Sequence, residues 1–369
     1  MRFRRSRHLF CYWRDDELIV GDYRRRTAVA VDPVVVELLS ACDDWCGVAD
    51  VVAELAGYET ETVEAAMLSL CHNGLLDSGE PAAEVEEAMT CWRGWEPEAA
   101  LFHFGTKNAN YGPSTAELRA ELAGGAPVEL FKSYPDAERM VLPRTPVSLR
   151  EPFGDVLYGR RTHRSFAARP VPLQIFSTLL AAVFGPVAFV DGDEFGALAL
   201  RTSANGGARQ ESECYVAVFE VAGVEAGLYH YNALEHSLEL VREEVSREAV
   251  GELCAGQPAI REAAIVVFLT AVVGRVSAKY RDPRAYRVML LNAGHVGQTF
   301  ALAATALGLG AFTTAAFADE EVEALLGIDG VGETVLYVLA AGVPKDLRDG
   351  FPEGRAPAGL SAFRRRAQP

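Results

Sequence analysis

The sequence predicts an α+β protein in two parts, and three observations lead to this prediction. The segments 263–273 and 334–342 are apolar runs of strand length, as in strands buried on both faces of a sheet. Residues 293–310 have the helical spacing and apolar character of a buried helix. Residues 17–76 have the order strand, strand, three helices, strand, and this pattern indicates a separate small domain.

Composition limits the classes of partner. Half of the 369 residues are apolar, which suffices for two domains with real cores. The formal net charge of −16 argues against a nucleic acid or an anionic membrane as partner, because phosphate binding needs clustered cations. Residues 1–26 are the exception, with eight arginines against four acids. No secretory signal is evident and the seven cysteines lack framework spacing, so we expect a cytoplasmic protein with free thiols and no metal.

The amino-terminal module alternates strand and helix patterns. Short β-branched runs predict strands, apolar residues at helical spacing predict helices, and Asn73–Gly74 is a helix stop. We expect strands at 17–20 and 27–31, helices from Pro33, from a cap at Asp50 to Leu55 and over 60–72, and a last strand from Leu75.

This order of elements is that of a small winged-helix domain. Winged helices usually bind DNA, but the helix that would enter the groove has Glu59, Glu61 and Glu64, which would repel phosphates. The module resembles the peptide-clamp domains of ribosomal peptide-modifying enzymes. In those domains a leader peptide adds a strand to the exposed sheet edge and lies against the third helix. A docking or dimerisation domain without a peptide remains the alternative.

The middle of the chain is rich in turns and separates two domains. LFHF at 101–104 predicts a short strand, and proline-rich segments predict a boundary near residue 150. We therefore divide the chain into a leader-peptide module, a linker with helical and strand elements, an α+β domain and a carboxy-terminal tail, at residues 1–85, 86–150, 151–345 and 346–369.

The predicted helix 293–310 has two distinct faces. Small residues recur every three or four positions, and a face without side chains lets a backbone or a flat ligand approach closely. These residues are Gly294, Gly297, Ala301, Ala304 and Gly308. Beside them lies a stripe expected to pack in the core, made of Val296, Phe300, Ala303 and Leu307.

Two polar segments of the second domain suit an anionic, flat ligand. Arg160, Arg161 and Arg164 lie within five residues together with the hydroxyl of Thr162, a density that suits a phosphate or a polyhydroxyl chain. A solvated basic turn is the alternative. The loop 201–210, RTSANGGARQ, offers backbone N–H groups and space for a ring against the main chain.

In their order these motifs resemble those of the nitroreductase superfamily. The chain is most similar to the FMN-dependent azoline dehydrogenases that mature thiazole- and oxazole-containing ribosomal peptides. The resemblance implies a nitroreductase-like fold, a mixed sheet flanked by helices, with flavin at the interface of a homodimer. The matching motifs are RRTHRSF, TSANGG, GLYHY, KYRDPRAYR, NAGHVGQTFALAATALGLG and YVLAAGVP, spread over residues 150–345.

The resemblance also implies FMN as the cofactor and roles for particular residues. The phosphate, the ribityl chain and the pyrimidine edge would be held by Arg160, Arg161, Thr162 and Arg164. The other side of the isoalloxazine would face Ser203, Asn205 and Gly206 of a second subunit. Gly310 and Ala311 begin a segment that would approach the phosphate, although GAFTTAA has fewer glycines than the family pattern.

Oxidation of an azoline to an azole removes a proton from Cα and a hydride from Cβ. Flavin would accept the hydride, so the protein must supply a base and hold the ring. A Lys-Tyr pair stands at this position in azoline dehydrogenases, so Lys279 and Tyr280 are the candidate catalytic pair, and the identity of the base stays open. His295 lies on the packed helix and is expected to be structural.

We therefore expect a flavoenzyme that dehydrogenates azolines in a leader-bearing precursor peptide. The expected partners are a second copy of the chain, the precursor peptide and a cyclodehydratase that forms the azoline, with neither nucleic acid nor membrane. Two alternatives remain. One is a flavin-dependent reductase of nitro, quinone or dehydroamino-acid groups that uses NAD(P)H. The other is a non-catalytic relative that only binds peptide.

Overall fold

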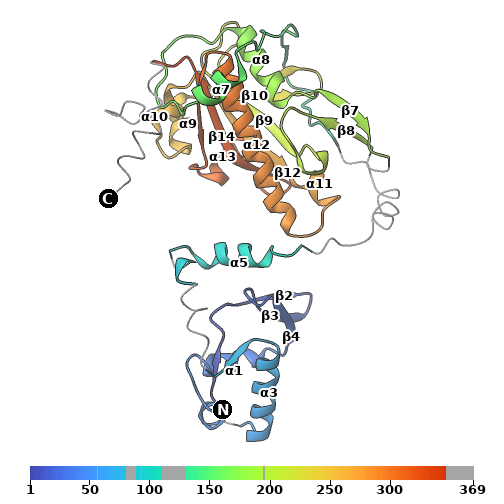
Figure 1. The fold of residues 1–369 in the computed structure, drawn as a ribbon, viewed down its shortest axis with the longest axis vertical. Helices are drawn as coiled ribbons and strands as arrows, with labels where there is room; N and C mark the ends of the chain where they lie inside the picture. Colours follow the sequence, from blue (N-terminus) through green and yellow to red (C-terminus); the bar gives the residue numbers. More distant parts are fainter. Residues whose placement is uncertain (56, 80–88, 93, 110–128, 194–195, 346–369) are drawn as a thin grey trace. The chain divides into compact units, whose positions relative to one another are not determined.

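A computed structural model describes residues 1–55, 57–79, 89–92, 94–109, 129–193 and 196–345. The chain forms two compact units (Figure 1), one made of Met1–Asn110 with Asp282–Arg284 and the other of the remaining residues. The predicted tail at 346–369 and much of the predicted linker lie outside the described residues. None of the helices in the described part is long and apolar enough to cross a membrane.

The first unit contains two small antiparallel sheets. One pairs β1 with β5, and the other has the strand order β2-β3-β4. The strands predicted at 17–20 and 27–31 are confirmed as β3 and β4, whereas β1 and β2 were not predicted. Most side chains of β2 are exposed, so it lacks the alternation that identifies a half-buried strand. The bounds are Phe3–Arg5 for β1, Leu9–Arg14 for β2, Glu17–Asp22 for β3, Thr27–Val31 for β4 and Leu76–Ser78 for β5.

Three helices complete this unit, and their buried faces form its core. They are α1 (Val34–Ala41), α2 (Val48–Glu54) and α3 (Thr60–His72), with buried residues such as Leu38, Val51 and Met67 in one cluster. The predicted cap of α2 was wrong by three positions. Gly47 is the N-cap, and Asp50 instead accepts a 2.7 Å hydrogen bond from its N–H, which satisfies a donor at the helix start. The winged-helix assignment stays a prediction.

The strand predicted at residues 101–104 was wrong, because this segment is helical. It lies within α5 (Pro97–Gly105), which follows a short 3-10 turn, η1 (Thr90–Trp92). Pro97 occupies the first turn, where its missing N–H costs nothing and its fixed φ favours a helix. The short apolar run LFHF is ambiguous between strand and helix, and here its aromatic residues pack on Trp92.

The second unit is built on a seven-stranded sheet of order β13-β14-β12-β9-β10-β11-β6. Every paired ladder among the described residues of this sheet is antiparallel, and the parallel pairs that the structure records are isolated bridges. One joins Thr162 to Ala311 at the β13 edge, and the other joins Val171 to Val221 beyond the end of β9. The bounds are Arg139–Val141 for β6, Ser212–Val218 for β9, Gly227–Asn232 for β10, Ser237–Arg242 for β11, Ile265–Val272 for β12, Gly310–Thr314 for β13 and Glu333–Gly342 for β14.

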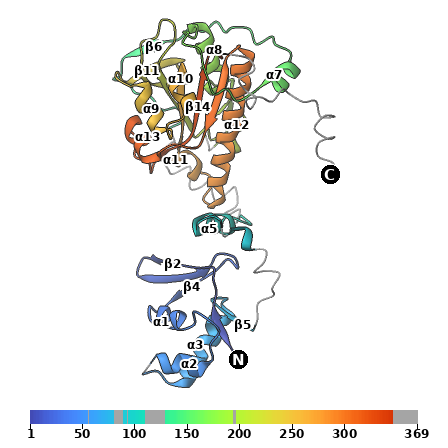
Figure 2. The same cartoon turned by 90° about the vertical axis from the view of Figure 1, so that its left-hand side faces the viewer.

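Helices cover both faces of this sheet (Figure 2), and the central strands alternate between two cores. Val216 and Val267 point to the core formed with α8 (Leu173–Phe184) and α12 (Arg284–Ala306). Tyr215 and Phe268 point to the opposite core. The second face is covered by α9 (Arg247–Leu253), α10 (Pro258–Glu262) and α13 (Asp319–Leu326). Both apolar runs predicted as buried strands are confirmed.

Five shorter elements complete the described part of the second unit: two short helices, a 3-10 turn and two strands that pair as a separate hairpin. They are α7 (Phe153–Gly159), α11 (Val273–Ser277), η3 (Gly206–Ala208) and the β7–β8 hairpin (Ala188–Asp191 and Ala197–Leu200).

The long helix α12 begins nine residues earlier than predicted, at Arg284, and ends at Ala306 rather than at 310. Its start is marked by Asp282, whose carboxylate accepts a 2.8 Å hydrogen bond from the N–H of Arg284. Charged residues in this first part hid the helix from a pattern based on small residues. Gly308 follows with a φ of 73°, a left-handed conformation that glycine adopts without strain.

Candidate functional site

The candidate site is organised by α12, which presents three faces to three neighbours. The predicted core stripe is confirmed, because its residues, Val296 and Phe300 among them, lie in the main core. A second face lines a cavity, and a third holds the loop 203–207. The cavity face consists of Gly294, Gly297, Gln298 and Ala301, and the loop face of Val288, Asn292, His295 and Thr299. These faces differ by one residue, which is about 100° around the helix.

The cavity measures about 110 Å³ and lies where three segments meet α12. Arg160 and Thr162 reach it from the segment after α7, Ala311 and Thr313 from β13, and Tyr337 from β14. The bridge between Thr162 and Ala311 and a 2.8 Å hydrogen bond from the N–H of His163 to the Ala311 carbonyl fix the first segment along β13. The cavity residues are therefore held by regular structure.

Two glycines allow the segments around the cavity to pack closely, and a third leaves space inside the cavity. A Cβ at Gly297 would lie 2.5 Å from Cε1 of Tyr337, and a Cβ at Gly310 would lie 2.8 Å from Cγ of His163. At Gly294, by contrast, a Cβ would meet no atom within 4 Å. Gly297 and Gly310 thus bring the backbones together, whereas Gly294 borders open space in the cavity.

The chemistry of the cavity suits one end of an anionic ligand. A guanidinium from Arg160 and the hydroxyls of Thr162 and Thr313 are donors for an oxyanion such as phosphate. Pockets for whole ligands usually measure about 300–1,000 Å³, so this cavity is too small for more than one group of a cofactor. The remainder of such a ligand would have to lie outside it.

Two of the four residues expected to hold the phosphate, the ribityl chain and the pyrimidine edge do not line the cavity. Arg161 donates from Nη1 to the carbonyls of Tyr158 at 2.8 Å and Arg160 at 2.7 Å, so it stabilises the end of α7. Arg164 is exposed and lies outside the cavity wall. Arg160 and Thr162 are therefore the two that the structure brings together with Ala311.

The loop 203–207 is fastened to α12. The hydroxyl of Ser203 donates to Thr299 Oγ1 at 2.7 Å, the N–H of Gly206 donates to Asn292 Oδ1 at 3.1 Å, and His295 Nδ1 lies 3.0 Å from the Ala204 carbonyl. A Cβ at Gly206 would overlap Val288. His295 thus has a structural contact, as the sequence predicted.

A buried carboxylate supports the same loop. Glu211 is fully buried, and its two oxygens accept hydrogen bonds from the amides of Asn292 at 2.7 Å and Asn205 at 2.8 Å. Asn205 Oδ1 also accepts the N–H of Gln210 at 3.1 Å. The side chain of Asn205 therefore positions the loop from within, while the backbone of Gly206 lies at its surface.

Lys279 and Tyr280 lie beside this loop and not in the cavity. The N–H of Tyr280 donates to the Val276 carbonyl at 2.9 Å, which continues α11, and the Lys279 ammonium lies 5.3 Å from the Tyr280 ring centroid. A Cβ at Gly207, whose φ is 69°, would overlap the Tyr280 hydroxyl. Tyr280 is 37 % exposed, and its hydroxyl lies against the backbone of Gly207.

The candidate residues of one chain therefore fall into two clusters on different sides of α12. Arg160, Thr162 and Ala311 belong to the cavity. Ser203, Asn205, Gly206, Lys279 and Tyr280 belong to the loop side.

Sequence reasoning missed a buried ionic network in the main sheet. His230 on β10 lies between Glu213 on β9 and Glu239 on β11, with 3.0 Å between each ring nitrogen and a carboxylate oxygen. Arg275 Nη1 lies 2.5 Å from Glu213, and Lys132 Nζ donates to Tyr215 and Glu333 at 2.6 Å. The signal was the presence of charged residues in strands that are otherwise apolar.

This network shifts the titration of its members. Burial disfavours the charged form of His230, but hydrogen bonds to the two carboxylates outweigh it and raise its pKa above 6.5. Burial likewise opposes ionisation of Glu213 and Glu239, yet their bonds to His230 lower both pKa values to about 2. His230 therefore joins three neighbouring strands through its contacts with two carboxylates, and these contacts favour its charged form.

The structure is a two-unit α+β protein with a small cavity beside its long helix, and comparisons identify its family. The profile of the nitroreductase family matches residues 157–343. A protein of Methanocaldococcus jannaschii described as a nitroreductase is 34% identical over 174 residues, which cover 47% of this chain and 83% of that protein. This chain belongs to the nitroreductase family.

The chain is also similar to a second sequence relative, over a longer part of its length, and to a solved structure. The trifolitoxin-processing protein TfxB of Rhizobium leguminosarum bv. trifolii is 26% identical over 354 residues, covering 90% of this chain and 94% of that protein. A crystal structure from Anabaena variabilis, described as a nitroreductase, superposes with a TM-score of 0.50 at 28% identity. That match covers 60% of this chain and 45% of the other, so this chain spans less than half of the solved protein.

Proposed function

We propose that this protein is an FMN-dependent oxidoreductase that dehydrogenates azolines to azoles in a ribosomally made precursor peptide. The observation that carries the proposal is the cavity where Arg160 and Thr162 meet the small face of α12. Similarity to a trifolitoxin-processing protein over nine-tenths of the chain supports a peptide as substrate. A cyclodehydratase would supply the azoline.

FMN fits the residues that line the cavity. Arg160, Thr162 and Thr313 would hold the phosphate, and the Gly294 position leaves space beside it. Arg161 would stabilise the segment after α7 through its hydrogen bonds to the carbonyls there. Arg164 would reach the cofactor from its exposed position. Bound FMN would supply the hydride acceptor.

The separation of the cavity cluster from the loop cluster supports a homodimer, in which each cluster would form half of a shared site. The cavity holds only one end of a cofactor, and the loop with Lys279 and Tyr280 lies on another face of the same helix. A second copy would bring its own loop to the part of the cofactor outside the cavity. Exposed apolar side chains on α7 and α12 support this assembly, because such surfaces are usually covered. They include Phe153, Leu157, Tyr158, Tyr286, Leu290 and Leu291.

The chemical role of Lys279 and Tyr280 is removal of the Cα proton as hydride leaves Cβ. Their proximity, 5.3 Å from the ammonium to the ring, makes them one proton-accepting unit. Exposure of the Tyr280 side chain allows a peptide ring to reach it. The Cα proton would pass to this pair, the electrons of the Cα–H bond would form the Cα–Cβ double bond, and the hydride from Cβ would pass to the flavin, so atoms and charge balance.

A second candidate is a flavin-dependent reductase that uses NAD(P)H. Its support is the 34% identity to a protein described as a nitroreductase. A reductase needs no base next to the flavin, so the Lys279–Tyr280 pair would then be dispensable.

The test uses purified full-length protein and a synthetic peptide that contains one thiazoline. We expect flavin absorption bands, bleaching of the flavin by the peptide without nicotinamide, and loss of two hydrogen atoms from the peptide by mass spectrometry. A protein that NAD(P)H bleaches rapidly, and that leaves the thiazoline peptide unchanged, would be the reductase instead. A protein that binds no flavin would contradict both.

A further inference from the structure

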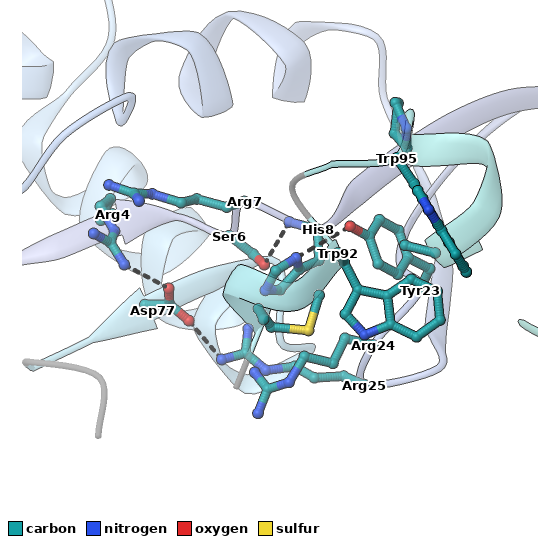
Figure 3. A pocket seen from close by; sticks show the side chains of 13 residues that line it. Arg4, Ser6, Arg7, His8, Tyr23, Arg24, Arg25, Asp77, Trp92 and Trp95 are labelled. Carbon is teal, nitrogen blue, oxygen red and sulfur yellow. Dashed lines mark hydrogen bonds and ion pairs between the residues drawn. The ribbon is translucent and has the colours of Figure 1, made fainter. Parts of the chain in front are cut away.

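The first unit has a pocket of about 280 Å³ that the proposed chemistry does not use (Figure 3). It lies between the segments that precede β2 and β4 on one side and the residues around η1 and α5 on the other. None of its lining residues belongs to β4, an edge strand of its sheet, or to α3, the helix against which an added leader strand would lie. We call it the arginine–tryptophan pocket, and its lining includes Arg7, His8, Arg24, Asp77, Trp92 and Trp95.

The pocket is strongly cationic on an acidic protein. Four arginines line it against one carboxylate, Asp77, whose oxygens already lie 3.6 Å from Arg4 and 2.5 Å from Arg25. Arg7 and Arg24 form no hydrogen bond or ion pair with any residue that the structure describes. Two guanidinium groups are therefore available to a ligand, and each can bind a carboxylate with two parallel hydrogen bonds.

Aromatic rings form the opposite wall. Trp92 and Trp95 meet edge to face with centroids 5.4 Å apart, and Trp92 is fixed from behind by Phe104 at 5.6 Å. Trp95 is 66 % exposed, which is unusual for so large an apolar side chain. His8, whose Nδ1 lies 3.2 Å from the Tyr23 hydroxyl, adds a polar group, and burial lowers its pKa.

We propose that this pocket binds an acidic peptide segment, with carboxylates on Arg7 and Arg24 and an apolar or aromatic side chain against Trp92 and Trp95. The identification of this peptide as part of the precursor rests on the proposed function. The site would be a second contact, separate from strand addition at a sheet edge. It would favour precursors that place an acid next to an apolar residue.

A peptide fits better than a nucleic acid, although arginines and aromatic rings can also bind single strands. A phosphate chain must continue along cations beyond the pocket, whereas the chain as a whole has a net charge of −16. The recognition of a few carboxylates needs only the local excess of arginine. Because the guanidinium groups are partly open to solvent, binding would weaken with salt.

The test measures binding of two labelled hexapeptides to the full-length, flavin-containing protein by fluorescence anisotropy. One peptide is Glu-Glu-Phe-Glu-Glu-Leu, and the other has glutamine in place of every glutamate. We expect at least tenfold weaker binding of the glutamine peptide. The double variant Arg7→Gln/Arg24→Gln should also bind the glutamate peptide at least tenfold more weakly, since it removes both charge-assisted pairs and about 1.4 kcal/mol corresponds to tenfold.

Matched controls separate the pocket from general charge. Arg2→Gln/Arg14→Gln removes two exposed arginines outside the pocket and should change binding less than about twofold. Trp95→Ala should weaken binding of the glutamate peptide, and should no longer do so when alanine replaces both apolar residues of the peptide. Equal loss in both double variants, or equal binding of both peptides, would overturn the proposal. So would tighter binding of an oligothymidylate than of the glutamate peptide.

The outcomes also separate this proposal from the proposed function. If the protein oxidises thiazoline peptides but the Arg7→Gln/Arg24→Gln variant binds the glutamate peptide like wild type, the pocket is wrong and the activity stands. If the glutamate peptide binds in the pocket but no flavin is present, the proposed activity fails and the pocket stands.

Discussion

At the residue scale, function depends on a few side chains whose neighbours decide what they can do. Arg160 and Arg161 are adjacent in the chain, yet one lines the cavity and the other is bound to the carbonyls at the end of α7. Tyr280 differs from an ordinary exposed tyrosine because Lys279 and Gly207 contact it. The role of a residue at this site therefore depends more on the backbone around it than on its residue type.

Removal of the proposed base should affect turnover and leave flavin binding intact. We expect Tyr280→Phe and Lys279→Met each to lower kcat by about 10²–10⁴-fold, the usual range for loss of general base catalysis. Neither residue lines the cavity, so the flavin spectrum should persist. Single-turnover bleaching by a thiazoline peptide measures the step. Tyr58→Phe, at a similarly exposed tyrosine in the first unit, is the control, and unchanged rates in both pair variants would refute the assignment.

The buried His230 should give stability a maximum at mildly acidic pH. Its raised pKa means that its contribution is complete below about pH 6.5 and is lost as the pH rises through the folded-state pKa. Glu213 and Glu239 have pKa values of about 2 against 4.5 when unfolded, so their contribution is present above pH 4.5 and is lost as the pH falls. We expect the free energy of unfolding to be highest between these limits.

Denaturant titration at several pH values measures this effect. His230→Gln should lower the unfolding free energy by about 3–5 kcal/mol, because two carboxylates remain buried without their cation. The decrease towards alkaline pH should disappear in this variant. His72→Gln, at an exposed histidine, should leave the profile unchanged. A wild-type profile that is flat between pH 5 and 9 would contradict the imidazolium assignment.

At the element scale, α12 connects the core, the cavity and the loop. Its buried stripe and its small face could be predicted because apolar and small residues repeat at helical spacing. The first nine residues could not, because RAYRVMLLN contains charged and large side chains instead of the small residues that identify the later turns. The third face was not predictable either, since Asn292 and Thr299 gain their meaning only from a loop some ninety residues away.

A size series at Gly294 tests whether the small face makes room for a cofactor. Gly294→Ala should stabilise the helix by up to about 1 kcal/mol, because alanine is the better helix former and its Cβ meets no atom. Gly294→Leu should fill the cavity and raise the Kd for FMN at least tenfold, with thermal stability of the flavin-free protein retained. Fluorescence titration with FMN measures both, and equal affinity in the two variants would exclude the cavity as the binding site.

The remaining elements show where local sequence is insufficient. The central strands β12 and β14 were predictable because burial on both faces leaves an apolar run. LFHF was not, because four apolar residues suit either structure until Pro97 is recognised as a helix start. The cavity combines residues from four segments, and only the resemblance to a family related Arg160 to Ala311 before the structure did.

At the scale of the whole molecule, the proposed shared site would require that two copies meet. The exposed leucines of α12 would then be buried in the dimer. Activity should consequently depend on assembly, because neither copy alone would surround the proposed cofactor.

A charge on this surface should separate the copies and release the flavin together. We expect Leu291→Glu, at a position 62 % exposed, to give a monomer in sedimentation analysis and to weaken FMN binding by at least tenfold. Leu234→Glu introduces the same charge at a comparably exposed leucine in the β10–β11 turn and should leave both properties unchanged. A flavin-loaded monomer would exclude a shared site.

The bridge between Thr162 and Ala311 has a consequence for the aggregation of the protein. β13 is the outermost strand of its sheet, and the segment with Arg160 is what shields its open side. An unshielded border strand can recruit other chains and start aggregates. A ligand bound to Arg160 would hold this segment against β13. We therefore expect the flavin-free protein to aggregate at a lower temperature than the flavin-loaded protein, as measured by light scattering during heating.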